Sequence, residues 1–175
     1  MEFKEIISKR RSVRKFSDHV VPQEVIDRLL DCALLSPSSK NSRSTRFLVV
    51  TNRAAIERMA DMRDSGARFI KNASLVILLL GDPEVNLWRE NAAIAATVLQ
   101  LACVDEGLSS CWVQINDRPR VKECPEGEKA IDFLRTFLPI PTDCEVLCAI
   151  ATGYSDFTPA ALPPFERAEK IICMK

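Results

Sequence analysis

Five of the seven residues in the segment Lys9–Lys15 (KRRSVRK) are basic, although the whole chain carries no net charge. If residues 10–14 are extended, alternate side chains share a face, so Arg10, Ser12 and Arg14 point the same way. Two guanidinium groups and a hydroxyl that converge on one point form a phosphate-binding site. The alternative is a solvated charge run at the C-terminal end of a short helix, where basic residues are favoured. Charge alone favours this second interpretation.

The polar segment 36–43 (SPSSKNSR) is a second candidate for a binding site. Its composition of turn-forming residues predicts a loop. Serine hydroxyls, an asparagine amide and free backbone N–H groups suit hydrogen bonding to a polar heteroaromatic ligand. An ordinary surface loop is the alternative, and the segment taken alone favours it.

Several motifs that would carry other chemistry are absent from the sequence. It has no G-x-G-x-x-G, no phosphate-binding P-loop and no G-x-S-x-G. The only histidine, His19, lies in a charged segment, which leaves little for a nucleophile–histidine scheme. No C-x-x-C pair is present, so no metal site is predicted. An enzyme of this composition needs a cofactor for its reactivity, and a flavin fits because it transfers hydride without a protein nucleophile. We therefore expect no catalytic side chain.

The length of 175 residues predicts a single domain over residues 1–175. The balance of 24 Lys and Arg against 24 Asp and Glu argues against a general nucleic-acid binder. The longest apolar run, Leu75–Leu80, is far shorter than the roughly 20 residues that cross a bilayer. Most of the seven cysteines stand among apolar residues, as Cys32 does in LLDCALL, and are expected to be buried and reduced. We expect a cytoplasmic protein without a nucleic-acid or membrane partner.

Hydrophobic periodicity predicts helices and strands in alternation along the chain. The expected helices cover residues 2–9, 22–36, 52–59, 84–106 and 126–138. The expected strands cover residues 47–51, 75–80, 109–114 and 144–152. This order predicts an α+β or mixed α/β fold, a sheet wrapped by helices. The helix at 84–106 is apolar on most faces, which indicates a central position or a dimer interface. Prolines in residues 157–175 predict an extended C-terminal arm.

The segments described so far resemble, in order and over nearly the whole chain, the nitroreductase family of FMN-dependent oxidoreductases. The resemblance is carried by RRSVR, SPSSKNSRSTRF, the alanine-rich helix, EGLSSCWV and a final strand that ends in Gly153–Tyr154. It implies a nitroreductase-like fold with a central, mostly antiparallel sheet. It also implies a homodimer whose interface is the long central helix, with FMN bound between the subunits.

The resemblance implies a set of FMN-binding residues. They are Arg10, Arg11, Ser12 and Arg14 at the phosphate and ribityl chain, Pro37, Ser38, Ser39, Asn41 and Arg43 in the loop that reaches the other subunit's flavin, Trp112 and Gln114 beside the ring, and Gly153 and Arg167 near the phosphate. In a strictly extended hook, Arg11 points to the opposite face, toward the ring or the partner chain. Arg167 is the substitute for a basic residue that the family carries in its proline-rich tail.

The sequence departs from the family pattern at several places. Arg43-Ser44-Thr45 stands where Gln-Pro-Trp is common, and Asn91 stands where the long helix often begins with Asp. The insertion that covers the flavin in larger relatives is absent or reduced between Ile115 and Glu126. These differences predict an altered and more open substrate pocket.

The function implied by the resemblance is an FMN-dependent NAD(P)H oxidoreductase. NADH or NADPH would reduce the flavin, and the electrons would pass to a nitroaromatic, quinone or similar small-molecule acceptor by a ping-pong route. A non-catalytic FMN-binding or flavin-storage dimer is the alternative. A small module that binds nucleic acid or another anionic partner through the basic segment is the third hypothesis.

Overall fold

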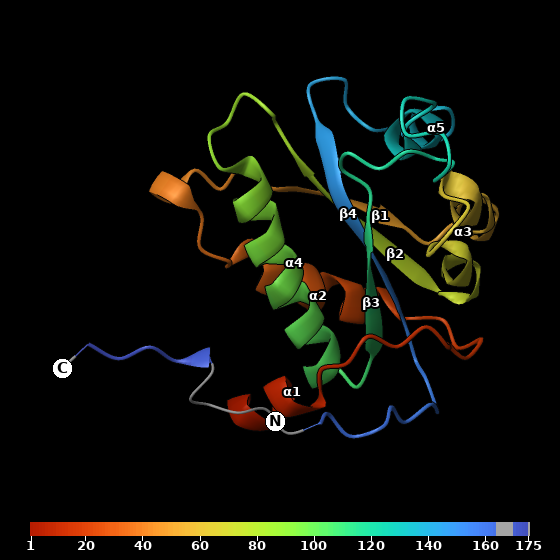
Figure 1. The fold of residues 1–175 in the computed structure, drawn as a ribbon. Coiled ribbons are helices and arrows are strands. Elements are labelled where there is room, and N and C mark those ends of the chain that lie inside the picture. Colours follow the sequence, from red (N-terminus) through yellow and green to blue (C-terminus); the bar gives the residue numbers. More distant parts are fainter. Residues whose placement is uncertain (164–169, 175) are drawn as a thin grey trace.

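The computed structural model describes residues 1–163 and 170–174, and its centre is a four-stranded antiparallel sheet (Figure 1). The strands are Arg46–Val50 (β1), Leu75–Gly81 (β2), Ser109–Gln114 (β3) and Glu145–Gly153 (β4). The α-helices are Phe3–Lys9 (α1), Gln23–Leu34 (α2), Arg53–Met59 (α3), Trp88–Asp105 (α4) and Ala130–Arg135 (α5). Short 3-10 turns are Ser39–Asn41 (η1), Ala60–Met62 (η2) and Arg68–Asn72 (η3). The strand order β1-β2-β4-β3 leaves β1 and β3 at the edges.

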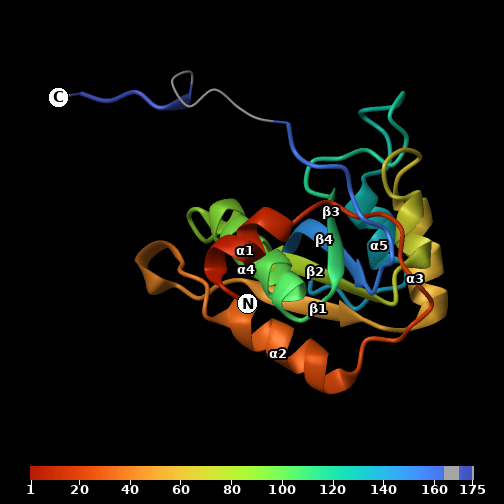
Figure 2. The ribbon, with the colours of Figure 1, turned by 90° about the horizontal axis from the view of Figure 1, so that it is seen from below.

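Helices cover both faces of this sheet (Figure 2). Helices α1, α2 and α4 lie on one side, and α3 and α5 lie on the other. The central strand β2 is buried at every position. Leu75, Ile77 and Leu79 pack toward α2 and α4, while Leu78 and Leu80 pack toward α3 and α5. A strand covered on both faces needs a continuous apolar run, which explains the sequence LVILLL. The predicted α+β class and antiparallel sheet are confirmed.

Two predicted helices begin later in the structure than in the sequence-based assignment. The helix expected from Glu84 begins at Trp88, because the Asp82 side chain accepts a hydrogen bond from the Glu84 N–H at 2.9 Å and closes a turn. Leu87 then takes a left-handed conformation with φ of 60°. The helix expected over 126–138 is limited to α5. The residues before it are held in a turn by a bridge between Pro119 and Lys129.

The predicted burial of the cysteines is confirmed for four of the seven and is wrong for Cys32. Cys103, Cys111, Cys144 and Cys148 are buried, whereas Cys32, Cys124 and Cys173 are exposed, and all seven are free thiols. The 3.6-residue repeat of α2 explains the error. It buries Leu29 and Ala33 against the sheet, so the intervening position 32 faces solvent.

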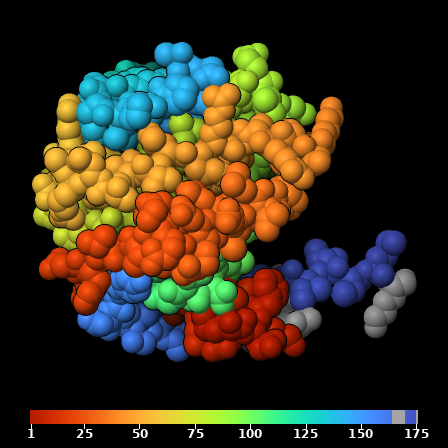
Figure 3. Space-filling view, turned by 180° about the vertical axis from the view of Figure 1, so that it is seen from behind, coloured from red at the N-terminus to blue at the C-terminus, as the bar shows by residue number. Residues whose placement is uncertain are grey.

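The C-terminal segment leaves the body of the protein after β4. Residues 157–163 contain no helix or strand, and residues 170–174 stand apart from the body (Figures 1 and 3). The exposed side chains of this segment include Phe157, Leu162 and Ile172. Within the described ranges, no helix is both long and apolar enough to cross a bilayer.

Leu78→Ala is expected to lower the free energy of unfolding by about 2–5 kcal/mol, because it leaves a cavity in the centre of the sheet. Leu78 is completely buried and belongs to β2, the strand that lies between β1 and β4. The matched control is Leu35→Ala at the end of α2, where the side chain is 85% exposed, and its effect is expected within about 0.5 kcal/mol. Urea unfolding followed by circular dichroism measures both. Equal losses in the two variants would contradict the assignment of the core.

Candidate functional site

The basic segment lies along the free edge of β3. The Val13 N–H donates to the Ser110 carbonyl at 3.0 Å, and Ser12 forms a parallel bridge with Ser110. Val13 is only 4% exposed, so its side chain points into the protein. Because side chains alternate in an extended segment, Ser12 and Arg14 point outward. We call residues 10–16 the hook.

Three predicted phosphate ligands of the hook affect the thiol of one cysteine of β3. Burial raises the pKa of the Cys111 thiol, while the Arg14 guanidinium, the Ser12 hydroxyl and the Arg10 guanidinium act in the opposite direction. The extended backbone of the hook places these three side chains on the same face. Within residues 1–163 and 170–174, no carboxylate lies within ion-pair distance of Arg10 or Arg14. Two uncompensated guanidinium groups and a hydroxyl suit a doubly charged phosphate.

Arg11 lies on the other face of the hook. Its guanidinium donates to the carbonyl oxygen of Ala160 in the C-terminal segment. The Ser155 hydroxyl donates to the Lys15 carbonyl at 2.6 Å. The chain that follows β4 therefore holds the hook against the sheet, and Arg11 is placed away from Arg10 and Arg14.

Gly153 makes room for the end of the hook. A Cβ atom added there would lie 3.2 Å from the Ser74 hydroxyl and 3.3 Å from the Phe16 ring. The Ser74 hydroxyl is buried and has no hydrogen-bond partner within the described parts of the chain. A side chain at position 153 would push Phe16 away, and with it the residues that precede it.

The second predicted set, in residues 37–43, forms a tightly held loop. Lys40, Asn41 and Arg43 all have left-handed backbones, with φ of 52°, 52° and 47°. Three such residues in four positions persist only where surrounding contacts enforce them. The Arg43 N–H donates to the Ser38 hydroxyl at 2.9 Å, and the Arg43 Nε donates to Asn41 Oδ1 at 3.2 Å.

Asn91, at the beginning of α4, anchors this loop from below. Its Oδ1 accepts a hydrogen bond from the Ser39 N–H at 2.8 Å, and its Nδ2 donates to the hydroxyls of Ser42 and Ser44 at 3.3 and 3.4 Å. The residue is 2% exposed. In the sequence, Asn91 stands out only as a departure from the family pattern. An amide in the first turn of a mostly apolar helix is the signal that could have identified it as the loop's support.

Trp112 and Gln114 lie together at the far end of β3. The Trp112 indole donates to Gln114 Oε1 at 2.9 Å, and Gln114 Nε2 donates to the Asn116 carbonyl at 3.5 Å. The backbone carbonyl of Gln114 accepts from Arg63 at 3.2 Å. From Ser110 to Gln114 the strand rises about 13 Å. The edge of β3 thus connects the end beside the hook with this polar end, over a length that suits a nucleotide-sized ligand.

The hook and the loop are not brought together within one chain. The loop is anchored at Asn91, whereas the N-terminal segment reaches the opposite end of α4, where the Met1 amino group pairs with Asp105 at 2.8 Å (Figure 1). Fourteen helical residues separate these two positions, which is about 21 Å. The loop and the N-terminal segment that precedes the hook therefore lie toward opposite ends of α4.

Among the described residues, the remaining candidate positions add no further group to the site. Arg167 lies outside the described residues, and Pro37 is an exposed residue of the loop. His19 is exposed and sits 3.1 Å from the Ser17 hydroxyl. Within the described parts of the chain, no cluster of His, Cys, Asp and Glu could hold a metal ion.

Comparisons with known proteins agree with this architecture. The sequence profile of the nitroreductase family matches residues 7–79 and 62–154. The structure is similar to that of an FMN-dependent nitroreductase from Clostridium difficile, with a TM-score of 0.83 and 37% identity over 90% of each chain. A protein of Methanothermobacter thermautotrophicus, provisionally named NADH dehydrogenase/NAD(P)H nitroreductase, is 29% identical over 170 residues, which are 95% of this chain and 84% of the relative. A provisionally named relative from Parabacteroides distasonis gives a TM-score of 0.86 at 28% identity, over 99% of this chain and 98% of that chain.

Asn91→Ala is expected to release the loop, because the Ser39 N–H and two serine hydroxyls lose their shared partner. The expected loss of stability is about 1–3 kcal/mol. The amide of Ser39 should exchange with deuterium faster, measured by hydrogen-exchange mass spectrometry of peptides covering residues 36–46. Thr97→Ala, at an exposed position of the same helix, is the control. Unchanged exchange in the loop of Asn91→Ala would show that Asn91 does not support it.

Proposed function

The chain belongs to the nitroreductase family, and from this premise we propose that it is an FMN-dependent NAD(P)H oxidoreductase that reduces a small-molecule acceptor. The observation that carries the proposal is the group formed by Arg10, Ser12 and Arg14 on the free edge of β3. The three residues alternate along the hook. Among the described residues, neither Arg10 nor Arg14 forms an ion pair with a carboxylate. Their chemistry fits the phosphate monoester of FMN.

The edge of β3 offers further groups along the proposed flavin. The carbonyls of Ser110 and Gln114 both accept hydrogen bonds from the side that β4 does not occupy. The direction of the backbone N–H and carbonyl groups of a strand repeats at every second residue. The N–H of Trp112, which lies between Ser110 and Gln114 in this series, therefore faces the same side. The hydrogen bond from the Trp112 indole fixes the Gln114 amide, so its N–H donors are oriented before a ligand arrives.

When bound, FMN supplies the hydride acceptor and donor that this chain lacks. The roles left to the protein are to hold the phosphate, to orient the ring against β3 and to admit the two substrates in turn. The exposed position of His19 agrees with a mechanism that uses no protein nucleophile or general base at the ring.

A homodimer is part of this proposal. The hook and the loop 37–43 lie at opposite ends of α4, so a second copy in the opposite orientation would bring its loop to the first copy's hook. The face of α4 turned away from the sheet is available for this contact. Ile94 is 39% exposed, and Val98 and Leu101 are half-buried at helical spacing on that face. The exposed apolar residues of the C-terminal arm could add to such an interface.

The acceptor side of the site is proposed to be open. Residues 116–129 form a compact turn closed by the Pro119–Lys129 bridge rather than a helical cover. This supports small molecules such as nitroaromatics or quinones as acceptors, and we propose no nucleic-acid or membrane partner. The seven free thiols support a location in the reducing cytoplasm.

A flavin-storage dimer is the second candidate. It is favoured by the segment that replaces Gln-Pro-Trp, because Arg43 is already bonded to Asn41 and Ser38. These side chains would then contribute less to a substrate pocket.

Arg14→Ala is expected to weaken FMN binding by about 10- to 100-fold, because it removes a charge-assisted hydrogen bond worth roughly 1.5–3 kcal/mol. Folding should lose no more than about 1 kcal/mol, since the interaction of the Arg14 guanidinium with the protein is a cation–π contact with the Phe69 ring, 5.7 Å from its centroid. Flavin titration and urea unfolding measure the two effects. Lys4→Ala on α1 removes a cation of the same N-terminal region and should leave FMN affinity unchanged. Full FMN affinity in Arg14→Ala would refute the phosphate assignment.

Anaerobic stopped-flow mixing of the FMN-loaded protein with NADH or NADPH decides between the two candidates. Bleaching of the flavin's visible absorbance, followed by recovery on adding a nitroaromatic or quinone, is expected for the oxidoreductase. A flavin that stays oxidised with both nucleotides favours the storage dimer.

A further inference from the structure

The chain that follows β4 is attached to the hook by hydrogen bonds at two neighbouring points. We call residues 154–160 the strap. The N–H of Ser17, the residue after the hook, donates to the Tyr154 carbonyl at 2.8 Å. The Ser155 hydroxyl donates to the Lys15 carbonyl at 2.6 Å. The strap and the hook therefore lie side by side where the chain leaves β4.

Two basic side chains of the hook add to this attachment. The Arg11 guanidinium donates to the Ala160 carbonyl, and the Lys15 ammonium group lies over the Phe157 ring, 4.8 Å from its centroid. Among the residues that the structure describes, the hydrogen bonds of residues 155–160 to other segments all end on the hook. The hook is therefore the surface to which this part of the strap is bound.

The strap and the proposed phosphate site use different side chains of the hook. Side chains alternate along an extended segment, so Arg11 and Lys15 point away from the face that carries Ser12 and Arg14. The strap engages the first pair and leaves the second pair available to a ligand. Because its contacts lie on both sides of Val13, they restrict the rotation of the backbone that directs Ser12 and Arg14.

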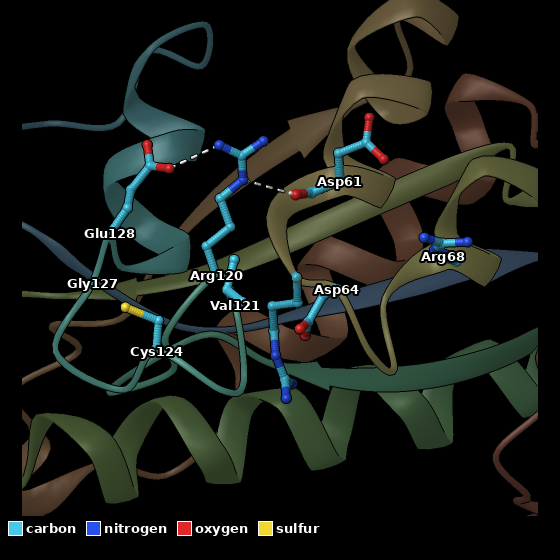
Figure 4. Close-up of a pocket in the computed structure, with 9 residues that line it drawn as sticks. Asp61, Asp64, Arg68, Arg120, Val121, Cys124, Gly127 and Glu128 are labelled. Carbon is cyan, nitrogen blue, oxygen red and sulfur yellow. Dashed lines mark hydrogen bonds and ion pairs between the residues drawn. The ribbon is translucent and has the colours of Figure 1, made fainter.

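The opposite end of β3 is less suited to a phosphate. A charged cavity of about 330 Å³ lies there, and Arg63 in its lining donates to the Gln114 carbonyl at 3.2 Å (Figure 4). The lining balances three arginines with three carboxylates: Arg63, Arg68, Arg120, Asp61, Asp64 and Glu128. The arginines on the phosphate-binding face of the hook have no such counterparts among the described residues. A phosphate on a ligand along β3 therefore belongs at the hook, next to the strap.

The hook is joined to β3 by few contacts of its own. They are the hydrogen bond from the Val13 N–H to the Ser110 carbonyl and the bridge between Ser12 and Ser110. An extended segment with few hydrogen bonds keeps conformational freedom that a ligand must remove when it binds. Attachment to the strap removes part of this freedom beforehand, so it strengthens binding without a direct contact to the ligand.

We propose that Ser155 is a positioning residue for the phosphate-binding face of the hook, and that the strap thereby favours FMN over a flavin without a phosphate. This role rests on the proposed function, because it takes the ligand of Arg10, Ser12 and Arg14 to be the FMN phosphate. The Ser155 hydroxyl acts through the backbone of the hook, since it is bonded to the Lys15 carbonyl. By reciprocity, bound FMN holds the strap on the hook.

Riboflavin tests this role, because it has the ring and ribityl chain of FMN and lacks the phosphate. Ser155→Ala is expected to weaken FMN binding by about three- to tenfold, the effect of one lost hydrogen bond, and to change riboflavin affinity by less than about twofold. Ser155→Thr keeps the hydroxyl and should keep the FMN affinity. Fluorescence titration of the flavin-free full-length protein with each flavin measures both affinities.

Thr158→Val is the matched control, because it removes an exposed hydroxyl of the same strap that forms no hydrogen bond within the described residues. It should leave both affinities unchanged. Equal weakening of the two flavins in Ser155→Ala would show a general loss of structure. That result, or an unchanged FMN affinity in Ser155→Ala, would overturn the role of Ser155.

Hydrogen-exchange mass spectrometry tests the reciprocal effect in the wild-type protein. FMN should slow the exchange of peptides covering residues 154–163 more than riboflavin does, because only FMN occupies the phosphate site beside the strap. Equal protection by the two flavins would contradict the coupling between the phosphate and the strap.

Neither measurement needs turnover, so the two proposals can fail separately. If NADH and NADPH leave the flavin oxidised, the oxidoreductase function fails, and the ratio of FMN to riboflavin affinity still decides the role of Ser155. An active enzyme whose Ser155→Ala variant keeps the wild-type ratio refutes that role and leaves the proposed function intact.

Discussion

The hydrogen bond from the Val13 N–H to the Ser110 carbonyl is the contact on which the proposed site depends. By aligning the hook with an edge strand, it buries Val13 and turns Ser12 and Arg14 outward. It also places the positive charge of Arg10 and Arg14 at one end of the outer edge of β3, where backbone N–H groups face away from β4. A basic surface segment that is not paired with a strand would point its cationic side chains in several directions. It would form no defined phosphate site.

Helix α4 is the second constraint, because it sets the distance between the two halves of the site. Its alanines pack closely on the sheet, and its first turn places Asn91 under the loop. The Asn91 amide satisfies donors of the loop, and three residues of the loop have left-handed backbones. The helix therefore belongs to the core, and its length sets the distance between the loop and the hook on the surface.

The sequence was informative where the signal is local. The strand β3 has the predicted bounds, Ser109–Gln114, and the alternation in the hook needed only the extended conformation. The beginning of α4 was misplaced, because a side-chain hydrogen bond from Asp82 competes with helix initiation. The pairing of Arg63 with Gln114 joins residues 51 positions apart, and no periodicity carries that information.

The placement of the hook and the loop at opposite ends of α4 has a thermodynamic consequence for the proposed dimer. Each ligand would be held half by one copy and half by the other, so a lone chain would offer only half a site. Cofactor retention and subunit association then become one linked equilibrium, in which each strengthens the other. Dilution would release flavin, and bound flavin would stabilise the association of the two chains.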